Sequence, residues 1–244
     1  MARRIGAIKP DTVLKYNAYW GPLTAQTPEQ CRDRWIFALL SGQTGWRQNV
    51  ESYLSVTSIP WETKAQLRTI LEATRCGLYT AKTKGIWHVM ELYRKGRADR
   101  ILMHPAEAGW VEPREGDTPG KPRWVEWRDK LVSLIDFNGK DILPHVGHKI
   151  AAFAHELCFP MDCKVAAVDT HVASWYGVDV NKTSMTPTLY HALEKHWVAT
   201  CDRHNYPPAM VRHILWDQIQ GFEDTRYWAH VFEQAPVETG AVVG

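Results

Sequence analysis

The stretch "DILPHVGHKIAAFAHELCFPMDCKVAAVDTHV", residues 141–172, decides the fold that this sequence predicts. Pro144 and Gly147 mark a tight turn, and helical periodicity resumes directly after them, so Lys149 falls in the first turn of a helix. We expect Gly147 to close the turn, because glycine adopts a positive φ without a steric penalty. After a second break in the helical pattern, Asp169 stands at the position of a helix N-cap.

The remainder of the chain also has helical periodicity, and strand signals are scarce. Further helices are predicted over 27–43, 46–57, 63–74, 80–96, 124–137, 186–200 and 208–222, with one more that begins near residue 169. The segment 104–123 has four prolines and three glycines, so we predict a long loop there that serves as a lid or as a substrate-recognition loop. The tail 235–244 is expected to be disordered.

Composition describes an ordinary soluble globular protein. The chain has 244 residues, of which 45% are hydrophobic and 23% charged, and its net charge of +2 neither requires nor excludes nucleic acid. Five cysteines without a CxxC pair suit a reduced, intracellular protein. No apolar run reaches the ~20 residues that span a membrane, and the start has no signal-peptide core. We expect a cytoplasmic monomer that does not associate with membranes.

Four segments together resemble one known superfamily. "LPHVGHKIA" (143–151) and "VDTHV" (168–172) are similar to the L-P-G-V-G-x-K-x-A hairpin and the V-D-[TV]-H element of the helix-hairpin-helix DNA glycosylases, the endonuclease III and 8-oxoguanine glycosylase superfamily. "LLSGQT" (39–44) resembles the L-L-S-x-Q-T element, and "CGLYTAKTKGIWHV" (76–89) resembles G-x-Y-x-x-K-A-x-x-I. The segments also follow one another in the order of that superfamily.

This resemblance implies an all-α fold, a two-lobed helical bundle with a DNA-binding cleft between the lobes. One lobe would comprise residues 1–27 and 138–234, and would hold the hairpin and the catalytic aspartate. The other would comprise 28–137, including the Pro/Gly-rich insertion at 104–123. The implied partner is double-stranded DNA that contains a modified base.

The resemblance gives Lys149 and Asp169 catalytic roles. In the similar bifunctional glycosylases, the lysine at this position attacks C1′ of the damaged nucleotide, displaces the base and forms a Schiff base, after which β-elimination cuts the strand. A neutral amine is required, so burial or nearby positive charge must lower the pKa of Lys149. A carboxylate at Asp169 would stabilise positive charge on the deoxyribose. The plainer interpretations are a surface lysine that contacts phosphate and an N-cap without catalytic work.

DNA contacts are expected from the hairpin and from one loop. The N-terminus of the helix after the hairpin suits a phosphate, and a glycine lets the DNA backbone approach closely. Something must also fill the space of an extruded base. The residues predicted to contact DNA are Gln43, His145, Val146, Gly147, His148 and His171. From the turn alone, an ordinary helix–helix connection with exposed histidines is the favoured interpretation.

The sequence also departs from the superfamily. His145 replaces the usual first glycine of the hairpin, which changes the steric freedom of the turn. Only Cys201 lies where endonuclease III relatives have four clustered cysteines, so no iron–sulfur cluster is expected. A monovalent cation held by hairpin carbonyls, as in relatives, remains open.

A protein metal site is not predicted either. The histidines and cysteines that crowd one region match no zinc-ligand spacing, and buried side chains account for them better. The residues concerned are His145, His148, His155, Cys158 and Cys163.

Three functions compete on this evidence. The first is a DNA glycosylase with lyase activity that uses Lys149 and Asp169. The second is a phage-type amino acid:DNA transferase on the same scaffold, which displaces pyrophosphate from a hypermodified thymine and leaves the glycosidic bond intact. The third is a non-catalytic helix-hairpin-helix protein, whose binding would depend strongly on salt. Retention of both Lys149 and Asp169 favours the glycosylase.

Overall fold

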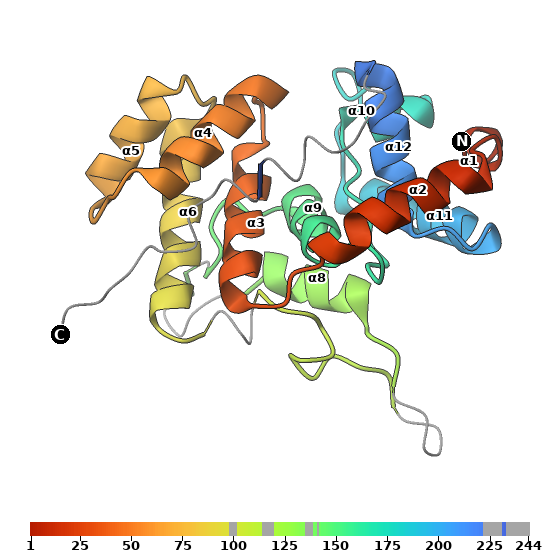
Figure 1. The fold of residues 1–244 in the computed structure, drawn as a ribbon, viewed down its shortest axis with the longest axis horizontal. Coiled ribbons are helices and arrows are strands. Elements are labelled where there is room, and N and C mark those ends of the chain that lie inside the picture. Colours follow the sequence, from red (N-terminus) through yellow and green to blue (C-terminus); the bar gives the residue numbers. More distant parts are fainter. Residues whose placement is uncertain (98–101, 114–119, 135–138, 141, 222–230, 233–244) are drawn as a thin grey trace.

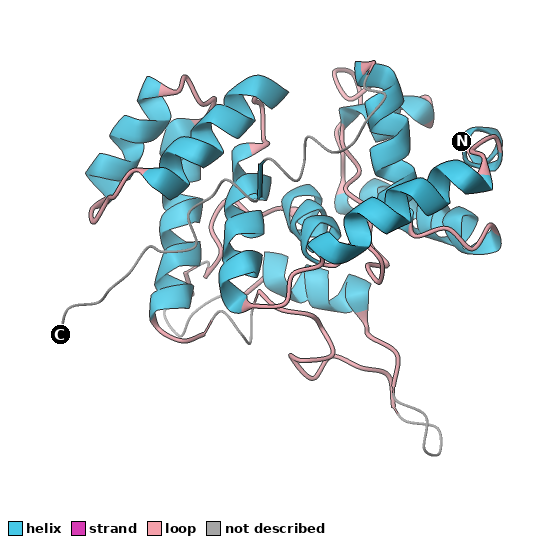
Figure 2. Ribbon diagram, in the orientation of Figure 1, coloured by secondary structure: helices cyan, strands magenta, loops and turns pink. Residues whose placement is uncertain are grey.

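A computed structural model gives the fold, and it describes residues 1–97, 102–113, 120–134, 139–140, 142–221 and 231–232. These residues form helices and no extended strand, and their one isolated β-bridge joins Val111 to Pro122 (Figure 2). The predicted all-α class is confirmed. Within the same residues, no helix is both long and apolar enough to cross a membrane. The predicted disorder of 235–244 concerns residues outside this description.

Most helices lie where the sequence predicts them. They are α1 (Ala2–Gly6), α2 (Pro10–Trp20), the 3-10 helix η1 (Gly21–Leu23), α3 (Pro28–Leu40), α4 (Trp46–Ser58), α5 (Lys64–Ala73), α6 (Tyr79–Arg94), α8 (Trp124–Val132), α9 (His148–Cys158), α10 (Thr170–Trp175), α11 (Pro187–Arg203) and α12 (Pro208–Gln220). Helices α1 and α2 were not predicted. The buried face of α2 consists of Val13, Tyr16 and Trp20, whose i, i+3, i+7 spacing is a helical signal carried by few residues.

Local signals fix where α3 begins. Thr27 is its N-cap, and the Thr27 hydroxyl accepts a hydrogen bond of 3.3 Å from the backbone N–H of Gln30. Pro28 occupies the first helical position, where the missing N–H costs nothing. A threonine followed by a proline is a sequence signal for the start of a helix, and the structure has both residues in these positions. The helix that ends at the "LLSGQT" segment is therefore set by its own sequence.

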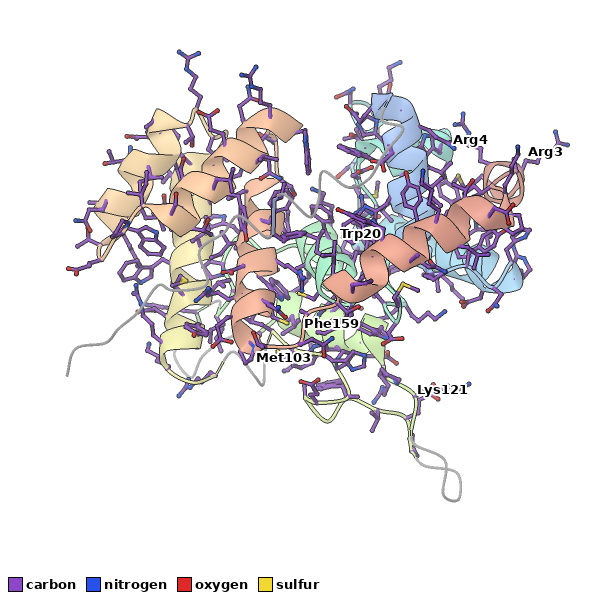
Figure 3. The ribbon with its side chains drawn as sticks, in the orientation of Figure 1. Arg3, Arg4, Trp20, Met103, Lys121 and Phe159 are labelled. Atoms are coloured by element: carbon purple, nitrogen blue, oxygen red, sulfur yellow. The ribbon has the colours of Figure 1, made fainter. Side chains whose placement is uncertain are left out.

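The helices form two groups with α9 between them (Figure 1). Helices α3 to α6 pack on one another, whereas α2 and α11 pack on α12. Helix α9 packs on both α3 and α8, and its Glu156 pairs with Arg212 of α12, so it connects the two groups. Figure 3 shows Trp20 on the inner side of α2, where its ring stacks on His213 of α12 at 4.2 Å, and Arg3 and Arg4 at the outer end.

The limits of the two lobes stay predictions, and the end of the chain complicates them. The ring of Phe232 lies 5.7 Å from the ring of Phe37 and 6.1 Å from that of Tyr53, which belong to α3 and α4. Residue 232 therefore packs on the helices of 28–137, although the sequence analysis assigned it to the other lobe. Sequence alone had no signal for this return of the chain.

The described parts of the insertion, 104–113 and 120–123, lead away from the helices (Figure 1). Trp110 anchors it, with its ring 5.5 Å from Trp127 and beneath the guanidinium of Arg123. Lys121 lies on the outer part of the segment (Figure 3). The middle of the insertion, 114–119, is outside the described residues.

A buried ion pair connects α9 to α12. Glu156 on α9 is fully buried and pairs with the guanidinium of Arg212 on α12. The other carboxylate oxygen of Glu156 accepts a hydrogen bond of 3.0 Å from the backbone N–H of Ala167. Burial raises the pKa of Glu156 to about 7, while Arg212 and the Ala167 N–H act in the opposite direction.

A second buried pair lies beside the first. Glu194 on α11 bonds Arg128 on α8 at 2.5 Å and accepts a hydrogen bond of 3.0 Å from the backbone N–H of Ala166. The side chain of Arg128 is 0% exposed. Two glutamates thus hold consecutive N–H groups of the extended segment that precedes Asp169. This arrangement fixes the direction from which Asp169 enters α10.

We predict that Glu194→Ala lowers the free energy of unfolding by about 3–5 kcal/mol, because it leaves the buried guanidinium of Arg128 without its main counter-charge. Urea denaturation measures the change. The matched control is Lys164→Ala, which removes an exposed ion pair with Asp202 (2.6 Å) and is expected to cost less than about 1 kcal/mol. Equal losses in the two variants would contradict this account of the buried pair.

Candidate functional site

The hairpin contains a four-residue turn with a strained third residue. The N–H of Val146 donates to the carbonyl of Leu143 at 3.3 Å, with Pro144 second in the turn and His145 third at φ +66°. This is the pattern of a type II turn, whose third position favours glycine. The expectation that Gly147 adopts a positive φ is wrong: its φ is −93° with ψ 176°, an extended conformation. The left-handed residue is His145, because the turn ends before Gly147.

The hairpin residues that were predicted to contact DNA differ in their solvent exposure. His145 and Gly147 are exposed, and a Cβ at Gly147 would meet no atom within 4 Å. Val146 is 5% exposed and packs in the core, so its predicted DNA contact cannot be made by its side chain. His148 is half-buried and faces Asp129 instead. Open space at the hairpin is therefore concentrated at Gly147, which is the N-cap of α9.

Lys149 points from α9 toward the end of α3. Its Nζ donates to the hydroxyl of Ser41 at 3.0 Å and lies 5.6 Å from the ring centre of Phe153. Burial lowers the pKa of Lys149 to about 8; Asp169 opposes this shift, and Arg212 adds to it. The serine of the "LLSGQT" segment thus has a contact that the sequence analysis did not assign.

Asp169 is the N-cap of α10, as predicted. Its Oδ1 accepts a hydrogen bond of 2.8 Å from the backbone N–H of Val172. The segment before it is held through Ala167 by Glu156, which lies on the same helix as Lys149. A carboxylate that caps one helix is in this way tied to the helix that carries the lysine.

Lys149 and Asp169 line one cavity of about 810 Å³ that lies among α4, α9, α10, α11, α12 and the turn after α3. Cavities of this size hold small-molecule ligands or single groups of larger ones. Other predicted residues that line it are Gln43, Gly147, His148 and His171, whereas His145 and Val146 do not. None of its lining residues comes from the described parts of 104–123, so the structure does not support the expected lid or recognition loop.

The cavity also has walls that were not predicted as site residues. Trp46 on α4 and Trp216 on α12 both line it and contact each other edge to face, with ring centroids 5.5 Å apart. Asn49 Oδ1 and Arg212 Nη2 are buried in its lining without a hydrogen-bond partner among the described residues. Nothing local in the sequence marks them, because each lies inside a helix whose cavity-facing side depends on packing. A buried acceptor and a buried donor are thus free for a ligand.

Gly77 and Lys82 fix the loop that carries Gln43. Gln43 has φ +49°, and its carbonyl oxygen would lie 2.4 Å from a Cβ at Gly77. The buried amine of Lys82 donates to the carbonyl of Leu40 at 2.6 Å and also to the hydroxyl of Thr44. The glycine and the lysine of the "CGLYTAK" segment therefore shape the turn after α3.

The five residues first considered for a metal do not form a site. His155 is fully buried, with Trp35 and Trp124 packed edge-on at 5.6 Å. Cys158 and Cys163 are buried and direct their thiols at backbone carbonyls. Among the described residues, the group with metal-ligand spacing is Asp129, His148 and His191. The absence of an iron–sulfur cluster and the monovalent cation at the hairpin stay expectations.

Comparison with solved structures gives the fold. The chain is similar to the crystal structure of the Methanocaldococcus jannaschii 8-oxoguanine DNA glycosylase, with a TM-score of 0.57 and 16% sequence identity over 86% of this chain and 87% of that chain. No protein-family model and no curated protein matches the sequence. At this identity the likeness concerns the fold alone. It confirms the all-helical glycosylase fold that the hairpin segment predicts.

We predict that two glycine substitutions differ in their effect on the free energy of unfolding. Gly77→Ala places a Cβ against the backbone of Gln43 and should lower the free energy of unfolding by about 1–3 kcal/mol. Gly147→Ala meets open space at an extended residue and should change it by less than about 0.5 kcal/mol. Chemical denaturation compares the two. A destabilised Gly147→Ala variant would show that Gly147 has a conformational role that its backbone angles do not indicate.

Proposed function

We propose that this protein is a DNA glycosylase with lyase activity. It extrudes a modified base from double-stranded DNA into the cavity and releases that base by attack of Lys149 at C1′. The observation that carries the proposal is that Lys149 and Asp169 line the same cavity. The likeness of the fold to that of a solved 8-oxoguanine DNA glycosylase supports it.

Lys149 supplies the nucleophile. Its amine forms a bond to C1′ as the glycosidic bond breaks, and the base leaves with the bonding electrons and a proton. Opening of the sugar ring gives a Schiff base between Nζ and C1′, and β-elimination then releases the 3′ phosphate. A desolvated amine suits this chemistry, and its hydrogen-bond partner Ser41 offers a hydroxyl that can accept as well as donate.

Asp169 stabilises the positive charge that develops on the deoxyribose as the base departs. The cap hydrogen bond to Val172 uses Oδ1, so the other carboxylate oxygen is available to face the sugar. Because the cap fixes the side chain, the charge is in position before the reaction begins.

Side chains that line the cavity recognise the extruded base. Trp46 and Trp216 supply aromatic surface for stacking, while Asn49 Oδ1 accepts and Arg212 Nη2 donates. An oxidised or oxo-substituted base offers both an N–H and a C=O to such a pair. His171, on the cavity lining, adds a further polar contact.

The duplex is held at two places. Phosphate groups contact the hairpin at Gly147 and the N-terminus of α9, where the backbone is open and the helix dipole favours an anion. His145 is exposed at the same turn and adds a phosphate contact. Gln43, in its fixed turn after α3, enters the space that the extruded base vacates.

Borohydride trapping tests the nucleophile. The protein is mixed with duplexes that carry 8-oxoguanine, thymine glycol, uracil, 5-hydroxymethyluracil or an abasic site, and the mixture is then reduced. We predict a covalent complex that disappears in Lys149→Gln and persists in Lys195→Gln, which changes an exposed lysine on α11. Strand cutting that survives Lys149→Gln would exclude Lys149 as the nucleophile.

The same experiment addresses the other functions. If no duplex gives a complex while DNA binding persists, the lyase assignment is wrong. Conversion of a hypermodified thymine without an abasic site would then favour the amino acid:DNA transferase. Salt-sensitive binding without any conversion would favour a non-catalytic protein.

A second prediction separates base recognition from chemistry. Asn49→Ala removes the buried acceptor and should slow excision of the preferred base by about 10- to 100-fold. Cutting at a preformed abasic site should not change, because that substrate has no base to recognise. Single-turnover assays on the two duplexes measure both rates. Equal losses on both would place Asn49 in the folding of the site and not in base recognition.

A further inference from the structure

Three side chains from three helices converge beside the hairpin. Asp129 lies on α8, His148 is the first residue of α9, and His191 lies on α11. Asp129 Oδ1 is 3.5 Å from His148 Nε2 and 3.2 Å from His191 Nε2, and one ligand atom from each residue lies within 4.8 Å of the others. None of the three residues is close to another in the sequence, so tertiary packing alone forms this group.

The two separations from Asp129 are those of ligands on one metal ion, and the third falls within the same 4.8 Å limit. Donor atoms on a tetrahedral Zn²⁺, with bonds of about 2.0–2.1 Å, stand about 3.3–3.4 Å apart. The two measured contacts of Asp129, 3.2 and 3.5 Å, lie on either side of that value. A hydrogen bond to Asp129 accounts for the position of His191 at 3.2 Å. It does not account for the position of His148, because 3.5 Å is too long for a normal hydrogen bond.

The surroundings complete the pattern of a metal centre. Arg128 Nε donates to Asp129 Oδ1 at 2.7 Å, an outer hydrogen bond of the kind that orients ligating carboxylates. The charge of Arg128 is already offset by Glu194, so it does not by itself repel a cation. The three side chains are 33%, 23% and 39% exposed for Asp129, His148 and His191, which leaves an entry path for an ion.

We propose that Asp129, His148 and His191 bind one Zn²⁺ ion. Two imidazoles and one carboxylate form a donor set that suits Zn²⁺, whereas Mg²⁺ and Ca²⁺ prefer oxygen ligands alone. Three protein ligands leave one coordination position for water. The ion joins α8, α9 and α11 at the base of the hairpin, and it restrains the residue that immediately precedes Lys149.

Zinc titration of the full chain tests the site. The protein is treated with a chelator and dialysed, and Zn²⁺ alone is added while bound metal and the melting temperature are measured. We expect one tightly bound Zn²⁺ per chain and a rise in melting temperature. His191→Ala should weaken binding by at least about 100-fold, because loss of an outer-shell partner alone costs ~10–100-fold.

The matched control is His196→Ala on the same helix, whose imidazole bonds the hydroxyl of Tyr176 at 2.9 Å and lies outside the group. It should bind zinc as the unchanged protein does. Asp129→Asn, which keeps the side-chain size, should weaken binding as His191→Ala does. In chelator, His191→Ala and Asp129→Asn should have the melting temperature of the unchanged protein. This comparison separates loss of a ligand from loss of the fold.

Two outcomes overturn the proposal. One is equal zinc affinity in the unchanged protein and in His191→Ala. The other is binding that thiol alkylation abolishes, because this would place the metal on a cysteine. No DNA is present in the titration, so a negative result here leaves the proposed glycosylase reaction untouched.

Discussion

The buried pairing of Glu156 with Arg212 is the interaction on which the candidate site depends most. A buried carboxylate without partners is strongly unfavourable, so Glu156 brings α12 and the backbone of Ala167 to α9. This single side chain thereby connects the helix that carries Lys149, the segment that leads to Asp169, and the helix that carries Trp216. The neighbouring Glu194 secures the preceding backbone group in the same way. Lys149 and Asp169, the proposed catalytic pair, are therefore positioned largely by ionic and backbone contacts of Glu156, to which the Lys149–Ser41 hydrogen bond adds.

Two lysines of the chain show how the same side chain takes different roles. Lys82 ends at the backbone carbonyl of Leu40, so its amine satisfies the end of a helix and shapes the loop of Gln43. Lys149 ends at a hydroxyl, on the lining of the cavity. Burial lowers the pKa of both amines. Only Lys149 lies where a ligand can reach it, and this access, not the lowered pKa alone, makes it the nucleophile of the proposed reaction.

The turn of the hairpin accommodates His145 at the position where the similar sequence pattern has glycine. His145 adopts the left-handed conformation that the usual glycine adopts freely, at a cost of about 1–2 kcal/mol. Histidine is among the residues that occupy this region more often than most. Gly147 carries no such strain, and its value lies in the open space beside its backbone. Close behind the turn, Gly85 of α6 lets the carbonyl of Pro144 approach to 3.2 Å of where a Cβ would stand.

Local signals in the sequence specify most of the helices and the caps at Thr27 and Asp169, because each depends on hydrogen bonds and periodicity within a few residues. The two-lobed helical class was implied only by the resemblance of four segments to a known superfamily. Tertiary structure alone decided the cavity walls at Asn49 and Arg212, since which side of a helix faces a cavity depends on its neighbours. It likewise decided that His191 meets Asp129, residues that are 62 apart in the sequence. Composition identified 104–123 as a loop but could not say which face of the molecule it would occupy. Local signals specify elements, whereas the site arises from contacts between elements, which only their packing defines.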